Sequence, residues 1–193
     1  MILLPETIYH IYNRGNNKQI LYFQERNYDF FLRKVVKELQ PHLDFLSYCL
    51  MTNHFHLMVC TKHDIDTRKF SGSLRTLLSS YTRAIQKQEH ITGSLFQQNS
   101  KSHEITDNHY AQTCFHYIHQ NPLKAGLVKR IEDWPYHSFN EYWKGDKGIC
   151  NTKLGKELLT IPNQPDRFYM ESYQVLVVPP LKWWHDSTKI PTL

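Results

Sequence analysis

Several marks of common protein classes are missing from this chain of 193 residues. Its four cysteines (Cys49, Cys60, Cys114 and Cys150) are widely spaced and form no C-x-x-C pair, which argues against a zinc ribbon and a disulfide scaffold. The opening run MILL is too short for a signal peptide, and no run approaches the ~20 apolar residues that span a bilayer. We therefore expect a cytoplasmic protein without a membrane segment.

The composition is that of one globular domain with a basic surface. Hydrophobic residues make up 40% of the chain and charged residues 21%, which suits a sizeable core. Lysine and arginine number 23 against 18 aspartates and glutamates, and there are 12 histidines. This balance favours a polyanionic partner such as nucleic acid over an acidic protein.

Hydrophobic periodicity predicts an α+β fold. Strands are expected over residues 7–13, 43–50, 54–60 and within 94–105, and helices over residues 25–39, 72–88 and 107–121. Asp107 is a suitable N-cap for the last helix, and Pro122 is expected to end it. This order matches a ferredoxin-like (RRM-like) antiparallel sheet with an added helix.

Beyond Lys144 the periodicity fades. The remaining segment contains five prolines and shows no sustained hydrophobic period. We therefore divide the chain into a domain over residues 1–145 and an irregular C-terminal extension over residues 146–193. The apolar residues Trp183 and Trp184, and those at 175–178, are expected to pack on the main domain.

The strand over residues 54–60 carries two histidines on one face. Because side chains alternate along a strand, His54 and His56 point one way, while Phe55, Leu57 and Val59 form a core face on the other side. The two imidazoles then converge within reach of one metal ion or phosphate. With 12 histidines in the chain, an H-x-H pair also arises readily by chance, so solvated or core imidazoles are the alternative.

The helix over residues 107–121 can supply partners for these histidines. Tyr117 and Asn121 are i, i+4 neighbours on its surface, and Tyr110 lies on the same flank. An activated phenol can form a covalent phosphodiester, and a divalent cation held by His54, His56 and the Asn121 carbonyl would polarise the phosphate. The alternative is that Tyr117 is a boundary residue with its hydroxyl in water.

Four stretches, in this order along the chain, resemble the single-tyrosine HUH transposases and in particular their REP-associated tyrosine transposase (RAYT) branch. They are YNRGNNKQILYF, LMTNHFHLMV, TGSLFQQNSKS and YIHQNPLKAGLV, and DWPYHSFNEYW resembles the aromatic segment that follows in this branch. The likeness runs from about residue 8 to residue 145. Two positions depart from it: Thr52 stands where many members have proline, and Asn99 where many have an arginine expected to contact phosphate.

The resemblance implies an HUH endonuclease domain and a metal-dependent reaction on DNA. In that family two histidines and a polar residue four after the tyrosine bind Mg²⁺ or Mn²⁺. The tyrosine attacks single-stranded DNA beside a hairpin, leaving a 5′-phosphotyrosine and a free 3′-hydroxyl. The likeness carries these roles onto His54, His56, Asn121 and Tyr117, and implies a bacterial, nucleoid-associated transposase; it leaves open whether the protein is a monomer or a homodimer.

Basic residues near these motifs are expected to contact DNA phosphates. Each is also of a type that is usually a solvated surface charge. The expected contacts are Arg14, Arg75, Arg83, Lys101, Lys124 and Arg130.

Two other functions compete with DNA cleavage. A domesticated, non-catalytic binder of structured DNA or RNA would predict a damaged site, whereas all four expected site residues are present. A zinc hydrolase using His54 and His56 would need a nearby carboxylate or third histidine at metal-ligand spacing, and the sequence supplies neither.

Overall fold

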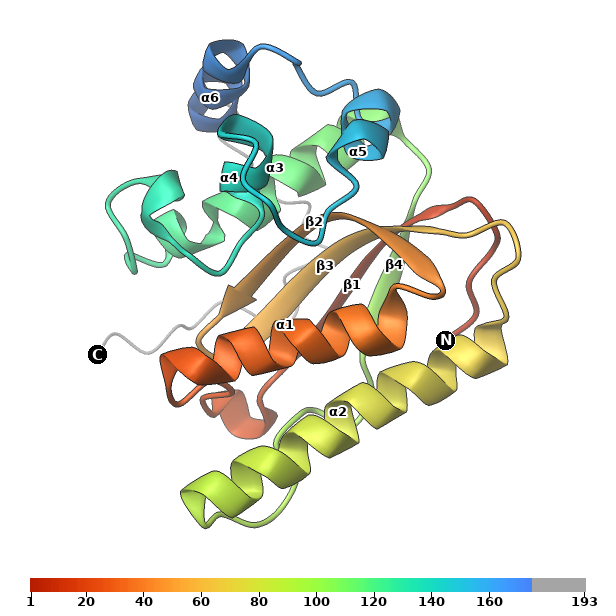
Figure 1. The fold of residues 1–193 in the computed structure, drawn as a ribbon, viewed down its shortest axis with the longest axis vertical. Coiled ribbons are helices and arrows are strands. Elements are labelled where there is room, and N and C mark those ends of the chain that lie inside the picture. The colour runs from red at the N-terminus through yellow and green to blue at the C-terminus, as the bar shows by residue number, and fades with distance from the viewer. Residues whose placement is uncertain (175–193) are drawn as a thin grey trace.

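The computed structural model describes residues 1–174, and its centre is a four-stranded antiparallel sheet in the order β2-β3-β1-β4 (Figure 1). The strands are β1 (Ile8–Arg14), β2 (Leu43–Met51), β3 (His54–Thr61) and β4 (Lys101–Ile105). The helices are η1 (Asn16–Lys18), α1 (Glu25–Leu39), α2 (Thr67–Glu89), α3 (Asn108–Lys124), η2 (Ile131–Asp133), α4 (Phe139–Trp143), α5 (Thr152–Leu158) and α6 (Pro165–Gln174). Two β-α-β units share this sheet, so the predicted ferredoxin-like α+β fold is confirmed.

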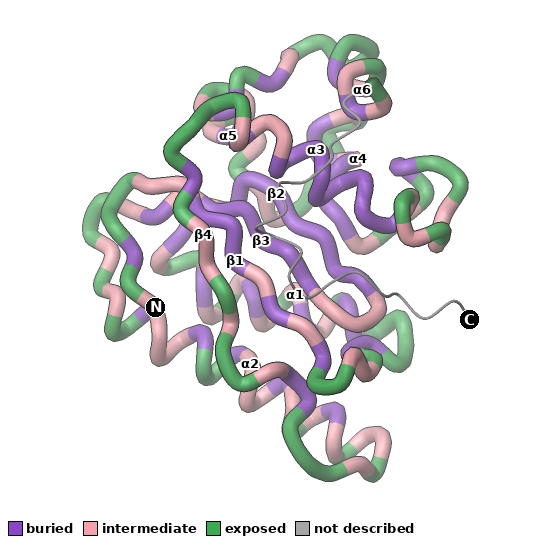
Figure 2. Tube along the Cα trace, turned by 180° about the vertical axis from the view of Figure 1, so that it is seen from behind, coloured by how far each residue is buried: buried purple, intermediate pink, exposed green. Residues whose placement is uncertain are grey.

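Helices cover the two faces of the sheet differently. Figure 1 shows α1 and α2 together on one face, while α3 to α6 gather on the other side, with α3 nearest to β2. Figure 2 shows the sheet from behind, where the buried trace of β1 and β3 runs through the middle of the molecule. Residues from β1 and β3 therefore enter two separate cores, one on each face.

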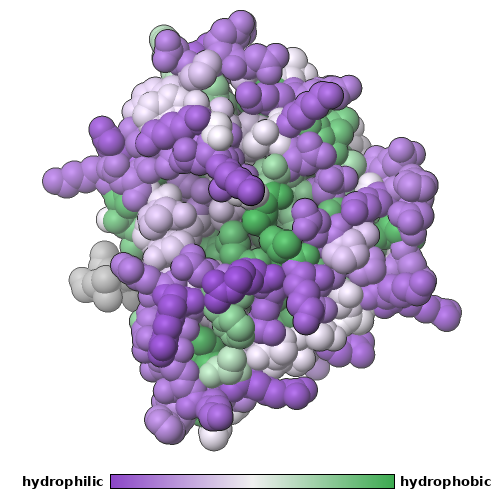
Figure 3. All heavy atoms as spheres, in the orientation of Figure 1, coloured by the Kyte–Doolittle hydropathy of each residue, from purple (hydrophilic) through white to green (hydrophobic). Residues whose placement is uncertain are grey.

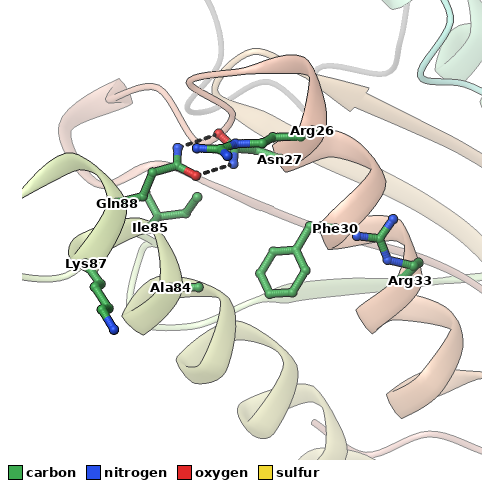
Figure 4. Close-up of a pocket in the computed structure, with 8 residues that line it drawn as sticks. All are labelled: Arg26, Asn27, Phe30, Arg33, Ala84, Ile85, Lys87 and Gln88. Atoms are coloured by element: carbon green, nitrogen blue, oxygen red, sulfur yellow. Dashed lines mark hydrogen bonds between the residues drawn. The ribbon is translucent and has the colours of Figure 1, made fainter.

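The α1/α2 layer follows the predicted amphipathic pattern. Tyr28, Phe31 and Val35 of α1 are buried, and the outward faces of the two helices are largely hydrophilic (Figure 3). Asn27 of α1 and Gln88 of α2 exchange side-chain hydrogen bonds of 3.0 and 3.2 Å (Figure 4). This layer is thus tied together by apolar packing and by a paired amide contact.

Several predicted boundaries differ from the structure. The α2 helix begins before residue 72 because the Asp66 carboxylate caps it, accepting hydrogen bonds from the backbone nitrogens of Arg68 and Lys69. Of the strand expected within 94–105, only β4 forms, and the residues before it make a loop with a single bridge between Gly15 and Phe96.

The C-terminal side of α3 and the segment after it also depart from expectation. Pro122 does not end α3, which runs on to Lys124, because a proline in the last turn removes only one helical hydrogen bond. The extension expected to be irregular contains the short helices α5 and α6. Trp183, Trp184 and residues 175–178 lie outside the described residues. No helix within residues 1–174 is both long and apolar enough to cross a membrane.

Candidate active site

The two histidines of β3 lie at its beginning and face the side of the sheet that carries α3. Their ring centres are 4.9 Å apart, with the planes nearly perpendicular at 87°. The His54 Nδ1–H donates a hydrogen bond to Asn53 Oδ1 at 2.7 Å. His56 Nε2 is buried, and within residues 1–174 it has no hydrogen-bond partner. The predicted alternation is confirmed, since Phe55, Leu57 and Val59 belong to the opposite core.

Both imidazoles are held in their neutral form. Burial, and then the nearby Arg14 guanidinium, lower the pKa of His54 from 6.5 to about 4. Burial, and then the charges that His54 and His10 would carry, hold the pKa of His56 well below 6.5. Because only a neutral imidazole has a lone pair for a metal ion, this environment suits ligation at neutral pH.

Helix α3 brings the predicted tyrosine against this pair. The Tyr117 ring is 5% exposed and meets the His56 ring edge-on, with 5.8 Å between centres. One turn on, Asn121 is 8% exposed and its Nδ2 donates to the backbone oxygen of Tyr117 at 2.9 Å. Burial raises the pKa of the Tyr117 phenol well above 10, and a side-chain hydrogen bond with Asn121 acts in the opposite direction.

The sequence explains why α3 presents these groups. The Asp107 carboxylate caps the helix by accepting a hydrogen bond from Tyr110 N at 2.7 Å, as predicted. The stripe formed by Cys114, Phe115 and Ile118 is fully buried and fixes the rotation of the helix on the sheet. The structure therefore links all four predicted residues, through the contacts of Tyr117 with His56 and Asn121 and of His56 with His54.

The donor set differs from that of a common structural metal site. Across residues 1–174, no three side chains of the types His, Cys, Asp and Glu come together as a metal-binding group. A metal ion here would need an amide oxygen such as that of Asn121 in addition to His54 and His56. Imidazole nitrogens and amide oxygens are both ligands that divalent cations accept.

A third histidine was missed from the sequence. His10 of β1 is 1% exposed, and its Nε2 lies 2.9 Å from Nδ1 of His56. Tyr12, two residues on, is the register partner of His56 and stacks on the His10 ring. The H-x-Y spacing within a predicted strand was an available signal, but it acquires meaning only once β1 is known to lie beside β3.

Three of the predicted DNA-contacting residues lie near this site. Arg14 is the register partner of His54 across β1 and β3. Lys101 is the register partner of Tyr12 across β1 and β4. Lys124 Nζ lies 5.8 Å from the centre of the Tyr117 ring. These three positive residues therefore lie next to members of the candidate site or to Tyr12 beside it.

The other three lie elsewhere. Arg75 and Arg83 project from α2 and line a groove of about 600 Å³, together with polar residues of the loop before β4. Arg130 forms ion pairs with Glu132 at 3.2 Å and Asp133 at 3.1 Å. Glu132 also accepts hydrogen bonds from Tyr169 and Tyr173 of α6, so Arg130 belongs to the contact that docks this helix.

Known proteins resemble this chain in sequence and in fold. The family described as "Transposase IS200 like" matches residues 5–121. A Haemophilus influenzae protein named "Putative REP-associated tyrosine transposase" is 26% identical over 157 residues, which cover 70% of this chain and 88% of that protein. A solved structure described as "Structure of the REP associates tyrosine transposase bound to a REP hairpin" matches with a TM-score of 0.64 at 18% identity, covering 77% of this chain and 87% of that one. At that identity the structural likeness establishes a shared fold.

Proposed function

Because the chain belongs to the IS200-like transposase family, as the resemblance in its sequence indicated, we propose that it cleaves and rejoins single-stranded, hairpin-bearing DNA through a 5′-phosphotyrosine on Tyr117. The observation that carries this proposal is the contact of the Tyr117 ring with His56, one helical turn from Asn121. A hairpin substrate is supported by the solved structure of similar fold, which is described as bound to a REP hairpin.

The proposed cleavage step is a displacement at phosphorus. The Tyr117 phenol oxygen attacks the phosphate, an O–P bond to tyrosine forms, and the bond from phosphorus to the 3′ oxygen breaks. The phenol proton is lost and the leaving 3′ oxygen gains one, so the products are a 5′-phosphotyrosine and a 3′-hydroxyl. Rejoining is the reverse attack by a 3′-hydroxyl, which returns a proton to Tyr117.

The surroundings of Tyr117 bear on how it is ionised. Burial disfavours the phenolate, whereas the Asn121 hydrogen bond and the Lys124 ammonium near the ring favour negative charge. A phosphate entering here also meets the positive charge of Arg14 next to His54. These residues would hold the phosphodiester in place and stabilise the charge that develops on it.

In this proposal His54, His56 and the Asn121 amide hold Mg²⁺ or Mn²⁺. The residues fit such an ion, because both imidazoles are neutral and the buried His56 Nε2 lacks a hydrogen-bond partner among the described residues. When bound, the ion polarises the phosphate and offsets negative charge on its oxygens. The remaining ligand positions would be open to substrate.

The groove beside α2 is proposed to bind DNA flanking the reacting phosphate. Its loop wall is hydrogen-bonded to the end of β1, with Gln97 N donating to Arg14 O at 2.9 Å. A single DNA strand that leaves the active site can therefore follow this loop toward Arg75 and Arg83. Asn99, which replaces the arginine of many relatives, also lines this groove.

Trapping of the covalent intermediate tests the proposed function. Wild-type protein incubated with a labelled hairpin-bearing single strand and Mn²⁺ should yield an adduct that survives SDS electrophoresis. Tyr117→Phe removes only the phenolic oxygen and should abolish that adduct. Tyr110→Phe, about two helical turns earlier on the same flank of α3, should retain it. An undiminished adduct in Tyr117→Phe would show that another residue is the nucleophile. Hairpin binding without any wild-type adduct would identify a non-catalytic binder instead.

A further inference from the structure

His10 lies in the strand next to the two candidate ligands and is almost fully buried. In the β1–β3 register His10 is opposite Met58 and Tyr12 is opposite His56, so His10 and His56 are diagonal neighbours on the α3 face. The two rings are stacked, with centres 5.0 Å apart and planes 26° from parallel. The separation between His10 Nε2 and His56 Nδ1 is 2.9 Å, which is a hydrogen-bond distance.

Either ring can be the donor in this hydrogen bond, and metal binding at Nε2 of His56 would select one of the two arrangements. A neutral imidazole has one N–H and one lone pair. A cation bound at Nε2 uses the lone pair of that nitrogen, so the proton of His56 must then lie on Nδ1. With the proton on Nδ1, the N–H donates to His10 and the lone pair lies on Nε2.

The neighbouring ligand shows the same arrangement. The Nδ1–H of His54 donates to Asn53 Oδ1, so the lone pair of His54 also lies on Nε2. Both candidate ligands thus have Nδ1 engaged by a protein acceptor and Nε2 available. Metal-binding histidines commonly have their second nitrogen held by a hydrogen-bond acceptor, which fixes the ring orientation and the tautomer.

We propose that His10 is a positioning residue for the reaction: its Nε2 accepts the Nδ1–H of His56 and so orients the His56 Nε2 lone pair toward a divalent cation. The proposal rests on the metal site of the proposed function. His10 is itself held in place, because its ring contacts both His56 and Tyr12, with 5.0 Å between ring centres in each pair, and the rings of His56 and Tyr12 also contact each other.

Metal affinity tests this role without relying on activity. Titration of full-length protein with Mn²⁺, followed by electron paramagnetic resonance, should show a loss of about 10–100-fold in affinity for His10→Phe. This variant keeps an aromatic ring but removes the acceptor. His103→Phe is the matched control, because His103 lies opposite His10 on β4 and contacts Tyr12. Its Mn²⁺ affinity should equal that of the wild type.

Two amide variants cover the case in which His10→Phe folds poorly. Glutamine can place its Oε1 close to the position of Nε2 and accept from His56, whereas the shorter asparagine cannot reach. We expect His10→Gln to bind Mn²⁺ more tightly than His10→Asn, at equal affinity for a hairpin DNA measured without metal. Equal Mn²⁺ affinity in the two variants, or wild-type affinity in His10→Phe, would overturn the proposal.

The tautomer of His56 gives a second readout, which needs no metal. Long-range ¹⁵N–¹H spectra of metal-free protein should show His56 protonated at Nδ1 in the wild type and in His10→Gln, but shifted toward Nε2 protonation in His10→Phe. An unchanged His56 tautomer in His10→Phe would overturn the role of His10. Absence of Mn²⁺ binding by wild-type protein, or full binding by His54→Ala, would instead overturn the proposed metal site while this spectrum still decides the role of His10.

Discussion

The two faces of the sheet are built from the same strands and serve different purposes. Toward α1 and α2, β1 and β3 project Ile11, Phe55, Leu57 and other apolar side chains into a core sealed by aromatic rings. Toward α3, the alternate residues of the same strands are His10, Tyr12, His54 and His56. The first face is an apolar core, whereas the second combines an apolar core of its own with the polar residues of the candidate site, although the residues of the two faces are adjacent in the chain.

The contrast extends to every buried histidine of the described residues. All of them lie on the α3 side, either at the candidate site or beneath it around α3, and none belongs to the α1/α2 core. They are His10, His56, His116, His119 and His137. A polar ring in a closed core has a cost unless it is satisfied or used. We therefore expect apolar burial in the α1/α2 core to help offset the free-energy cost of burying polar rings on the α3 side.

Phe55→Ala tests the division of labour with the largest expected effect on stability. Phe55 is fully buried against Phe31, so its truncation should lower the free energy of unfolding by about 3–5 kcal/mol in urea titrations. The adduct yield per folded molecule should stay close to wild type. Tyr117→Phe should behave in the opposite way, with little loss of stability and no adduct. A Phe55→Ala protein that is stable but inactive would show that the two faces do not act separately.

Acid should destabilise the folded protein through the buried histidines of the α3 side. Burial lowers the pKa of His116 and of His137 from 6.5 to about 4, so each is neutral when folded and would bind a proton more readily when unfolded. Their contribution to stability is complete above pH 6.5 and is lost as pH falls toward 4, by about 1.4 kcal/mol per pH unit for each group.

His116→Phe should flatten this pH profile, because it removes one titrating ring and keeps an aromatic side chain against Phe115 and Phe168. His109→Phe, on the exposed side of the same helix, is the matched control. Urea titrations at several pH values between 4 and 7 provide the measurement. An identical slope in wild type and His116→Phe would contradict the assignment of acid sensitivity to this buried ring.

Local patterns in the sequence predicted much of this contrast. Strand alternation separated His54 and His56 from Phe55, the periodicity over residues 25–39 gave the bounds of α1, and i, i+4 spacing paired Tyr117 with Asn121. These are properties of a single strand or helix.

Features that depend on contacts between distant segments were not predicted. His10 gains its role only because β1 lies next to β3 in the sheet. The hydrophobic periodicity of a single segment does not reveal which strands are neighbours. The short helices α5 and α6 have too few residues for strong intrinsic stability. Their stability comes from packing, as in the hydrogen bonds from Tyr169 and Tyr173 to Glu132.

The smallest expected effect concerns two basic grooves that both border α2. One contains Arg83 and the loop tied to the active-site end of β1; the other lies between α1 and α2 and contains Arg33 (Figure 4). If only the first groove binds DNA, Arg83→Ala should weaken hairpin binding a few-fold. The slope of log affinity against log salt concentration should become shallower by about one, because one phosphate contact is lost. Arg33→Ala should change neither quantity. Fluorescence anisotropy at salt concentrations from about 50 to 200 mM measures both. Equal losses in the two variants would mean that DNA contacts the charge of α1 and α2 without preference, and that the loop before β4 does not guide it.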